Sequence, residues 1–267
     1  MPLRPGRLVR KMLMQVFKGT SVYGIPVLCY HSIDPSGSDL STSLPEFRSQ
    51  MRFLKENGYE TMSLTQLHAA GTTPMERRVV ITFDDGFANN FDLAFPVLKQ
   101  HSFTATFFIT AKYAGTMPGW LQGKEGFRET SAYPIMSWDQ IKELRQAGME
   151  IGSHTISHPY LSKLPESEQE EEIRGSKEII ERHLKEKIAH FCYPYGDFDQ
   201  RTVTLVRGAG YTTACTTAWG INKTTPDPFQ IKRVLVAEKI SDEFPFYFCR
   251  GMDFFDSVRE AVFGARP

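Results

Sequence analysis

The sequence VVITFDDG, residues 79–86, joins a β-branched and aromatic run to two adjacent carboxylates and a glycine. A short apolar run of this kind predicts a buried strand over residues 79–83, with Asp84 and Asp85 at its carboxyl end. Asp and Gly also favour tight turns, which is the alternative interpretation. Because a turn accounts for one aspartate better than for two, we interpret the pair as functional.

Similar apolar runs occur on both sides of this stretch and predict further strands at residues 25–30, 104–109, 149–153, 189–193, 212–216 and 231–236. Amphipathic spacing predicts helices at residues 44–57, 137–148, 167–184 and 200–207, and another after residue 86. Ser43 and Ser137 are the expected caps of the first two helices. This alternation predicts parallel strands inside a shell of helices, a barrel-like α/β domain.

Polar residues directly follow four of the predicted strands: His31; Asp84 with Asp85; His154 with His158; and Tyr193 to Gly196. The carboxyl ends of parallel strands lie at one edge of a sheet or barrel, where functional side chains gather. We therefore expect these groups to meet in one site.

His154 and His158 would lie one turn apart on a helix, close enough to bind one ion. A histidine pair with this spacing is common by chance, so it needs a third ligand. Asp85 supplies one, because a carboxylate with two neutral imidazoles is a common set for catalytic Zn²⁺ or a similar divalent ion. Adjacent carboxylates repel, and a cation next to Asp85 would help both to stay ionised.

Hydrolysis of an amide needs an activated water, a stabilised oxyanion and a proton for the departing amine. We assign Asp84 as the general base, His31 as the proton donor, and a backbone N–H near Tyr195, together with the metal, to the oxyanion. Two plain structural alternatives remain: a hydrogen-bonded histidine at a strand end, and an aromatic turn over Tyr193-Pro194-Tyr195-Gly196. At the rim of a cleft, such tyrosines would stack on a sugar ring.

Three motifs, TFDDG at 82–86, SHTISHP at 153–159 and YPYG at 193–196, resemble those of the NodB-type polysaccharide deacetylases, carbohydrate esterase family four. The resemblance spans roughly residues 25–236. It implies a distorted (β/α)7 barrel, a metal ion held by Asp85, His154 and His158, a base at Asp84, and substrates built from N-acetylated hexosamines.

Two positions depart from the common family pattern: Cys192-Tyr193 replaces the usual arginine before the Pro-Tyr-Gly turn, and a late Leu-x-His segment is absent. The opening PVLCYH, residues 26–31, resembles the subgroup related to biofilm poly-N-acetylglucosamine deacetylases, in which an N-terminal histidine replaces the acid. That resemblance supports His31. It also implies that Arg233 approaches Asp84 and keeps it ionised, although a surface ion pair is an equal alternative.

The chain has 267 residues, with 31 Lys and Arg balancing 31 Asp and Glu, so no overall field attracts nucleic acid. The four cysteines form no Cys-x-x-Cys pair and are expected to be small buried residues. We divide the chain into a basic tail or amphipathic helix (1–24), the deacetylase domain (25–240) and a C-terminal helical extension on the barrel (241–267).

The N-terminal segment carries five basic residues before the first acidic residue, Asp34, and places Leu8, Met12 and Val16 on one helix face. This pattern suits peripheral contact with anionic lipid, and a frayed tail is the alternative. Charges interrupt the apolar stretch 8–17, so it makes a poor signal-peptide core. We expect a cytoplasmic location or one peripheral to the inner membrane, with export as the alternative.

A long loop, residues 115–134, carries Trp120, Phe127 and Tyr133 and is expected either to overhang the cleft or to pack as plain surface. Trp219 suggests a similar, weaker role, and the aromatic stretch 244–248 is expected to pack on the barrel. The partner is an N-acetylated glycan, in a polysaccharide or a lipid-linked precursor. The alternatives are deacylation of another amide-bearing sugar, such as a formamido sugar, and a non-catalytic glycan-binding module.

Overall fold

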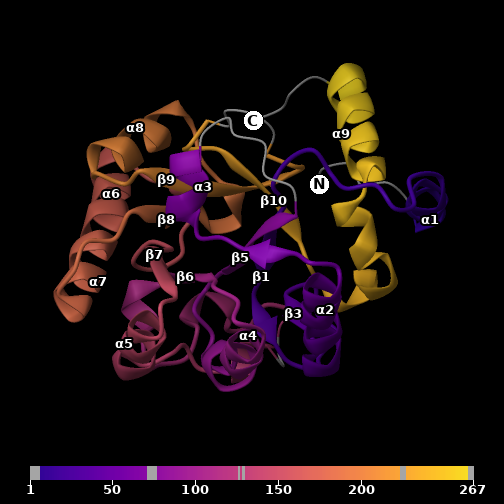
Figure 1. The fold of residues 1–267 in the computed structure, drawn as a ribbon. Coiled ribbons are helices and arrows are strands. Elements are labelled where there is room, and N and C mark those ends of the chain that lie inside the picture. Colours follow the sequence, from indigo (N-terminus) through magenta and orange to yellow (C-terminus); the bar gives the residue numbers. More distant parts are fainter. Residues whose placement is uncertain (1–6, 71–76, 126, 128–129, 223–226, 264–267) are drawn as a thin grey trace.

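A central barrel of parallel strands with surrounding helices forms the body of the molecule in a computed structural model, which describes residues 7–70, 77–125, 127, 130–222 and 227–263 (Figure 1). The barrel strands are β1 (Val27–Tyr30), β5 (Arg78–Phe83), β6 (Thr106–Ile109), β7 (Glu150–Ser153), β8 (His190–Cys192), β9 (Thr213–Trp219) and β10 (Ile231–Leu235). They pair in the order β1-β10-β9-β8-β7-β6-β5, and β5 pairs back with β1 to close the ring.

Every pairing in this ring is parallel, and the β9–β10 pairing shifts register between Ile231 and Arg233. The prediction of a distorted (β/α)7 barrel is therefore confirmed. A short strand, β4 (Glu60–Thr61), adds to β5 outside the ring, and β2 (Ser32–Ile33) pairs with β3 (Ser41–Thr42) just after β1.

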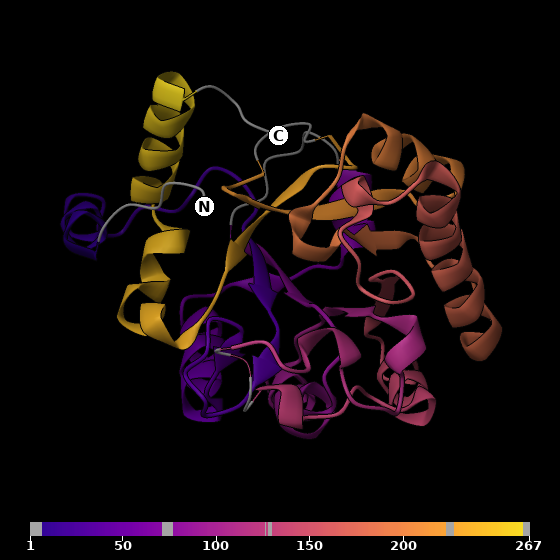
Figure 2. The same ribbon diagram turned by 180° about the vertical axis from the view of Figure 1, so that it is seen from behind.

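The helices are α1 (Arg7–Val16), α2 (Leu44–Glu56), α3 (Leu64–Ala70), α4 (Phe95–His101), α5 (Trp138–Gln146), α6 (Glu166–Glu170), α7 (Ser176–Leu184), α8 (Gln200–Gly208) and α9 (Arg250–Phe263). Two π-helical turns, η1 (Asn90–Ala94) and η6 (Glu171–Gly175), lie before α4 and between α6 and α7. The 3-10 segments are η2 (Ala111–Tyr113), η3 (Gly119–Leu121), η4 (Thr130–Ala132), η5 (Leu161–Lys163), η7 (Pro194–Gly196) and η8 (Glu238–Phe248). Figure 2 shows from behind that α6, α7 and α8 lie on the opposite side of the barrel from α1 and α9.

The strands are buried on both faces, which explains their nearly continuous apolar sequences. Alternate side chains of β5 belong to different packing clusters: Val79, Ile81 and Phe83 belong to the large cluster that includes helix residues, and Val80 belongs to a smaller cluster with Val27. This alternation follows from the two-residue period of a strand. It sends Asp84, two residues after Thr82, in the same direction as Thr82.

The helix predictions are confirmed with small changes at their ends. Ser137 caps α5 through a capping box with Gln140, whereas Ser43 precedes α2 without a side-chain cap bond. The predicted long helix after residue 167 is continuous from α6 to α7 but contains the π-helical turn η6.

The two terminal helices, α1 and α9, pack against each other and against η8. The aromatic stretch 244–248 is buried, as expected, and Trp219 is only 1% exposed and packs edge-on against Phe255, so its suggested role at the cleft is wrong. Residues 7–16 form a regular helix rather than a frayed tail. In the described part of the chain, no helix combines the length and the apolar composition needed to cross a bilayer.

Candidate active site

The carboxyl ends of the barrel strands surround one cavity of about 590 Å³. Its wall includes His31 after β1, Asp84 and Asp85 after β5, His154 and His158 after β7, Tyr193 and Tyr195 after β8, and Arg233 on β10. The structure thus brings together the groups that the order of the strands predicted to meet, as expected for side chains at the carboxyl edge of parallel strands.

Asp85, His154 and His158 present their ligand atoms to one point. Asp85 Oδ1 lies 3.5 Å from Nε2 of His154 and 3.2 Å from Nε2 of His158, and the ligand atoms of the trio all lie within 4.8 Å of one another. His154 Nδ1 donates a hydrogen bond to the Cys192 carbonyl at 2.8 Å, which leaves the lone pair of Nε2 facing Asp85.

The segment between these histidines is a loop and not the helix that their spacing suggested. Thr155 and His158 have left-handed backbone angles, φ 67° and 66°, which no α-helix contains. The Glu172 carboxylate on η6 holds the loop: it accepts hydrogen bonds from the backbone N–H groups of Ile156 and Ser157 at 2.8 and 2.9 Å, and from the Ser157 hydroxyl at 2.5 Å. These bonds replace helical ones, so the two imidazoles converge through loop geometry.

The chemistry of these three residues fits a divalent cation. Burial lowers the pKa of His154 to about 4 and that of His158 to about 3, so both imidazoles are neutral at physiological pH and able to act as ligands. Burial raises the pKa of Asp85, and its Oδ1 accepts no hydrogen bond from any described residue. A buried carboxylate that the protein leaves unsatisfied is stabilised by a cation.

Asp84 forms a buried ion pair with Arg233. Nη1 and Nη2 of Arg233 donate to Oδ1 and Oδ2 of Asp84 at 2.7 and 2.6 Å, and both side chains are less than 5% exposed. Burial alone would raise the pKa of Asp84, but the charge and hydrogen bonds of Arg233 hold it well below its usual range. The alternative of a surface ion pair is therefore wrong, and Asp84 is a carboxylate at neutral pH.

Two cysteines also surround Asp84, which the sequence did not indicate. Cys29 and Cys192 direct their thiols at Asp84 Oδ2 at 3.6 and 3.4 Å, and burial raises the pKa of both thiols, so they remain protonated. Arg233 also contacts Cys192 Sγ at 3.1 Å. The expectation that all four cysteines are buried holds, but these two additionally contact the carboxylate.

His31 lies beside Asp84, with its Nε2 3.9 Å from Asp84 Oδ2. Its side chain is 15% exposed, and its Nδ1 has no hydrogen-bond partner among the described residues. Burial lowers the pKa of His31. Neither nitrogen is engaged in a hydrogen bond that would prevent proton transfer.

Both tyrosines of the turn after β8 line the cavity, but only Tyr195 is partly exposed. The Tyr193 side chain is fully buried and donates from its hydroxyl to the Phe229 carbonyl at 3.2 Å, so the expectation that it stacks on a sugar is wrong. Tyr195, at φ 59°, turns its ring toward His158 and stacks on Tyr160 at 4.0 Å. Gly196 follows Pro194 and Tyr195 at φ 67°, where a Cβ would lie 2.0 Å from the Thr217 hydroxyl, so only glycine fits.

The loop at residues 115–134 borders the cavity through its described residues. Trp120 stacks on His158 at 4.8 Å, and Lys124 donates to the Tyr195 hydroxyl at 3.1 Å. Phe127 lines the same cavity, whereas Tyr133 packs beside it in a small apolar cluster. The loop therefore contacts a candidate metal ligand, His158, and the cavity tyrosine Tyr195.

Comparisons with known proteins find one matching family model and several similar chains. Residues 71–214 match the family model described as polysaccharide deacetylase. The chain is 32% identical over 220 residues to the Bacillus subtilis (strain 168) protein YxkH, covering 81% of this chain and 73% of that protein. It is 26% identical over 253 residues to the poly-beta-1,6-N-acetyl-D-glucosamine N-deacetylase of Escherichia coli (strain K12), covering 82% of this chain but only 37% of that enzyme's length. The structure of IcaB from Ammonifex degensii superposes with a TM-score of 0.72 at 27% identity, covering 85% of this chain and 98% of that one.

Proposed function

Because the chain belongs to the polysaccharide deacetylase family, we propose that it is a metal-dependent hydrolase that removes N-acetyl groups from N-acetylated hexosamines. The glycan is either a polysaccharide or a lipid-linked precursor. The observation that carries the proposal is the convergence of Asp85, His154 and His158 beside Asp84, a carboxylate that Arg233 keeps ionised.

Asp85, His154 and His158 would hold the metal ion, and the mixture of one carboxylate and two imidazoles favours Zn²⁺. When bound, the ion supplies a Lewis acid that acidifies water and polarises the acetyl carbonyl. The protein contributes a preorganised set of ligands, because Glu172 and the Cys192 carbonyl already fix the loop and one imidazole.

Asp84 accepts the proton of the attacking water as general base. Its low pKa, caused by Arg233, keeps it ionised over the neutral range. Both protonated thiols contact Oδ2, whereas Oδ1 accepts only from Arg233 among the described residues and keeps a lone pair for the proton. The backbone N–H near Tyr195 is the protein donor that we assign to the developing oxyanion.

His31 delivers a proton to the departing nitrogen. Because burial lowers the pKa of His31, the proton that it delivers is the one that Asp84 takes from the water. Asp84 passes this proton to His31, whose Nε2 lies 3.9 Å from Oδ2 of the carboxylate at the cavity wall. The amide C–N bond then breaks, and the products are acetate and a sugar with a free amine.

Tyr195 and Trp120 form the proposed sugar platform. Tyr195 is stacked on Tyr160 and bound by Lys124, and Trp120 is stacked on His158, so both rings are held at the edge of the cavity. Rigid aromatic faces of this kind bury the apolar face of a pyranose ring.

The test is acetate release from soluble β-1,6-linked N-acetylglucosamine oligomers and from lipid-linked N-acetylglucosamine, with N-formyl sugars assayed for formate in parallel. We expect acetate release that ends when a chelator removes the metal ion and that is absent from Asp84→Asn. Formate release without acetate would favour the formamido-sugar alternative. Glycan binding without any turnover, unaffected by chelator, would contradict an enzymatic role.

A further inference from the structure

Exposed apolar side chains gather around the two terminal helices. Large apolar residues that are exposed in the described part of the chain fall into two groups. Met117 and Tyr160 lie far from the terminal helices in the sequence and form the smaller group. The other seven lie on α1, on α9 or in the segment after α1: Leu8, Val9, Met12, Val16, Tyr23, Phe254 and Val258. A set of exposed apolar side chains on neighbouring elements marks an interaction site.

The orientation of α1 is fixed by contacts on its inner side. Arg10 forms an ion pair with the buried Glu243, and Leu13 is 5% exposed. Leu8, Met12 and Val16, spaced four apart, are 83%, 57% and 67% exposed. Because residues four apart share a helix face, the same contacts that anchor α1 turn an apolar stripe outward.

Helix α9 extends this stripe. Figure 1 and Figure 2 both show α1 beside α9 at the edge of the molecule, outside the barrel. The rings of Phe17 and Phe254 lie 6.1 Å apart, and Phe254 and Val258 are 54% and 44% exposed. We call Leu8, Met12, Val16, Phe254 and Val258 the α1–α9 face.

Cationic residues accompany this face. Lys11 and Lys18 are exposed, and no acidic residue precedes Asp34 in the sequence. An apolar stripe with lysines beside it and no carboxylate on the same helix is the pattern of a helix that lies in the plane of an anionic bilayer surface.

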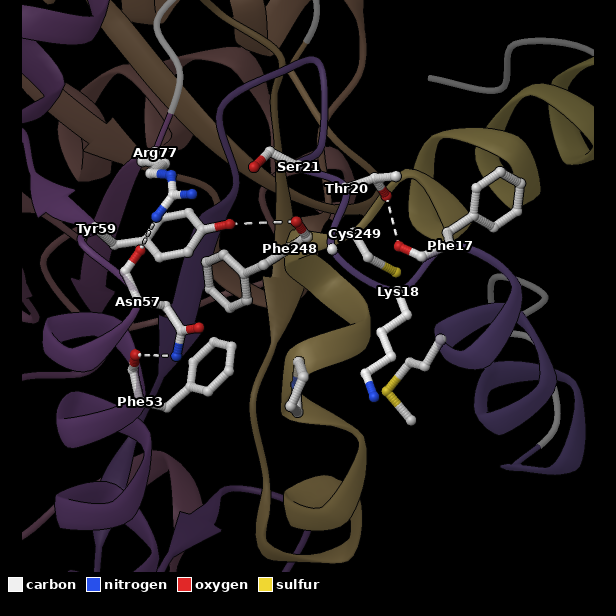
Figure 3. A pocket seen from close by; sticks show the side chains of 13 residues that line it. Phe17, Lys18, Thr20, Ser21, Phe53, Asn57, Tyr59, Arg77, Phe248 and Cys249 are labelled. Carbon is white, nitrogen blue, oxygen red and sulfur yellow. Dashed lines mark hydrogen bonds between the residues drawn. The ribbon is translucent and has the colours of Figure 1, made fainter.

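A cavity of about 240 Å³ between the ends of α1 and α2 and η8 is also lined by apolar and cationic side chains (Figure 3). Phe17, Phe53 and Phe248 supply aromatic walls, and Lys18 and Arg77 supply positive charge. Arg77 donates to the Asn57 carbonyl at 2.6 Å, whereas the Lys18 side chain makes no hydrogen bond to a described residue. No carboxylate occurs among its lining residues, so the surroundings of α1 favour an anionic ligand with an apolar part.

We propose that the α1–α9 face binds the surface of an anionic lipid bilayer, with α1 lying in the interface. A second copy of the chain is disfavoured as the occupant, because a twofold contact would bring the lysine-bearing helices of both copies together. The proposal concerns a surface outside the barrel and is independent of the deacetylation chemistry.

The experiment is co-sedimentation of the full chain with vesicles of phosphatidylcholine alone and with vesicles that also contain phosphatidylglycerol. We expect binding to the anionic vesicles that weakens with salt. The triple variant Leu8→Ser, Met12→Ser, Val16→Ser should lose about tenfold or more in affinity. Charge reversal by Lys11→Glu should lose roughly fivefold or more. Met117→Ser, an exposed apolar residue elsewhere, is the matched control and should bind as the unmodified chain does.

Deacetylation of a soluble oligomer by the triple variant separates this proposal from the proposed function. Unchanged turnover together with lost vesicle binding supports it. Vesicle binding that is equal in the triple variant, or absent from the unmodified chain, overturns it. A third result would also overturn it: light scattering shows a dimer of the unmodified chain, the triple variant is monomeric, and neither protein binds vesicles. The occupant of the face would then be a second copy.

Discussion

Replacing Arg233 by Met tests how the protein keeps its proposed base ionised. The substitution keeps much of the side-chain volume but removes the two hydrogen bonds of 2.7 and 2.6 Å to Asp84. It leaves a carboxylate that is 3% exposed without its cation. The two cysteine thiols remain, but neither carries a positive charge.

The magnitude follows from the burial of the pair. Breaking a buried ion pair by removing one partner lowers the free energy of unfolding by about 3–5 kcal/mol. For a chain of this size that corresponds to a drop in Tm of roughly 6–20 °C. Removing a surface pair has an effect of about 0–1 kcal/mol, so Arg174→Met, which breaks an exposed pair with Glu170, is the matched control.

The pH dependence has a defined sign. In the unmodified chain the pKa of Asp84 is lowered, so its stabilising contribution is present above the unfolded-state pKa and is lost as the pH falls through the folded-state pKa. In Arg233→Met, burial without the cation raises that pKa above the unfolded value. The stability difference between the two proteins should therefore be largest at neutral pH and smaller near about pH 4.

Urea unfolding of both proteins at several pH values, with acetate release measured in parallel, checks this reasoning. The acidic limb of kcat/KM should move to higher pH in Arg233→Met. A stability loss no larger than that of Arg174→Met, or an unchanged acidic limb, would refute the role given to Arg233.

Three further predictions concern the loop, the platform and the ligands. Glu172→Ala should lower metal affinity by about 10- to 100-fold, measured by competition with a chelator, because its carboxylate holds the loop between the two histidines. Trp120→Ala should lower kcat/KM by roughly 2- to 10-fold while metal content stays unchanged, since it removes one ring of the proposed sugar platform but no metal ligand. In the metal-free protein, urea midpoints should fall as the pH drops from about 6.5 toward 4. Over this range both histidines take up protons in the unfolded chain, whereas in the folded protein His154 and His158, with pKa values of about 4 and about 3, stay neutral. A flat profile would contradict those values.

The barrel and the meeting of its strand ends were predictable from the sequence for one physical reason. Apolar runs alternated with amphipathic helices, and that alternation leaves parallel strands whose carboxyl ends share an edge. His31, Asp84 and His154 each follow a strand directly, so their proximity required only the correct strand boundaries.

The local geometry depended on contacts that spacing does not encode. A separation of four between His154 and His158 suits a helix, but Glu172, fourteen positions beyond His158, selects a loop instead. Sequence reasoning also missed the thiols at Asp84, because Cys29 and Cys192 lie far apart in the chain and meet only when the barrel closes.

Burial decided the remaining differences. Tyr193 and Trp219 were expected at the cleft as aromatic residues near strand ends, yet both side chains are almost fully buried. Arg233 was equally compatible with a surface pair until its 2% exposure was known. The alternation of a strand assigns a face, but bulges and register shifts such as the one between Ile231 and Arg233 change which side chain reaches the site.

The most direct test of the central claim is metal content, measured by elemental mass spectrometry on the unmodified chain, Asp84→Asn and His154→Ala. We predict about one divalent ion per chain in the first two proteins, little in His154→Ala, and acetate release by the unmodified chain alone. Full metal content in His154→Ala, or turnover by Asp84→Asn, would contradict the site described for this barrel.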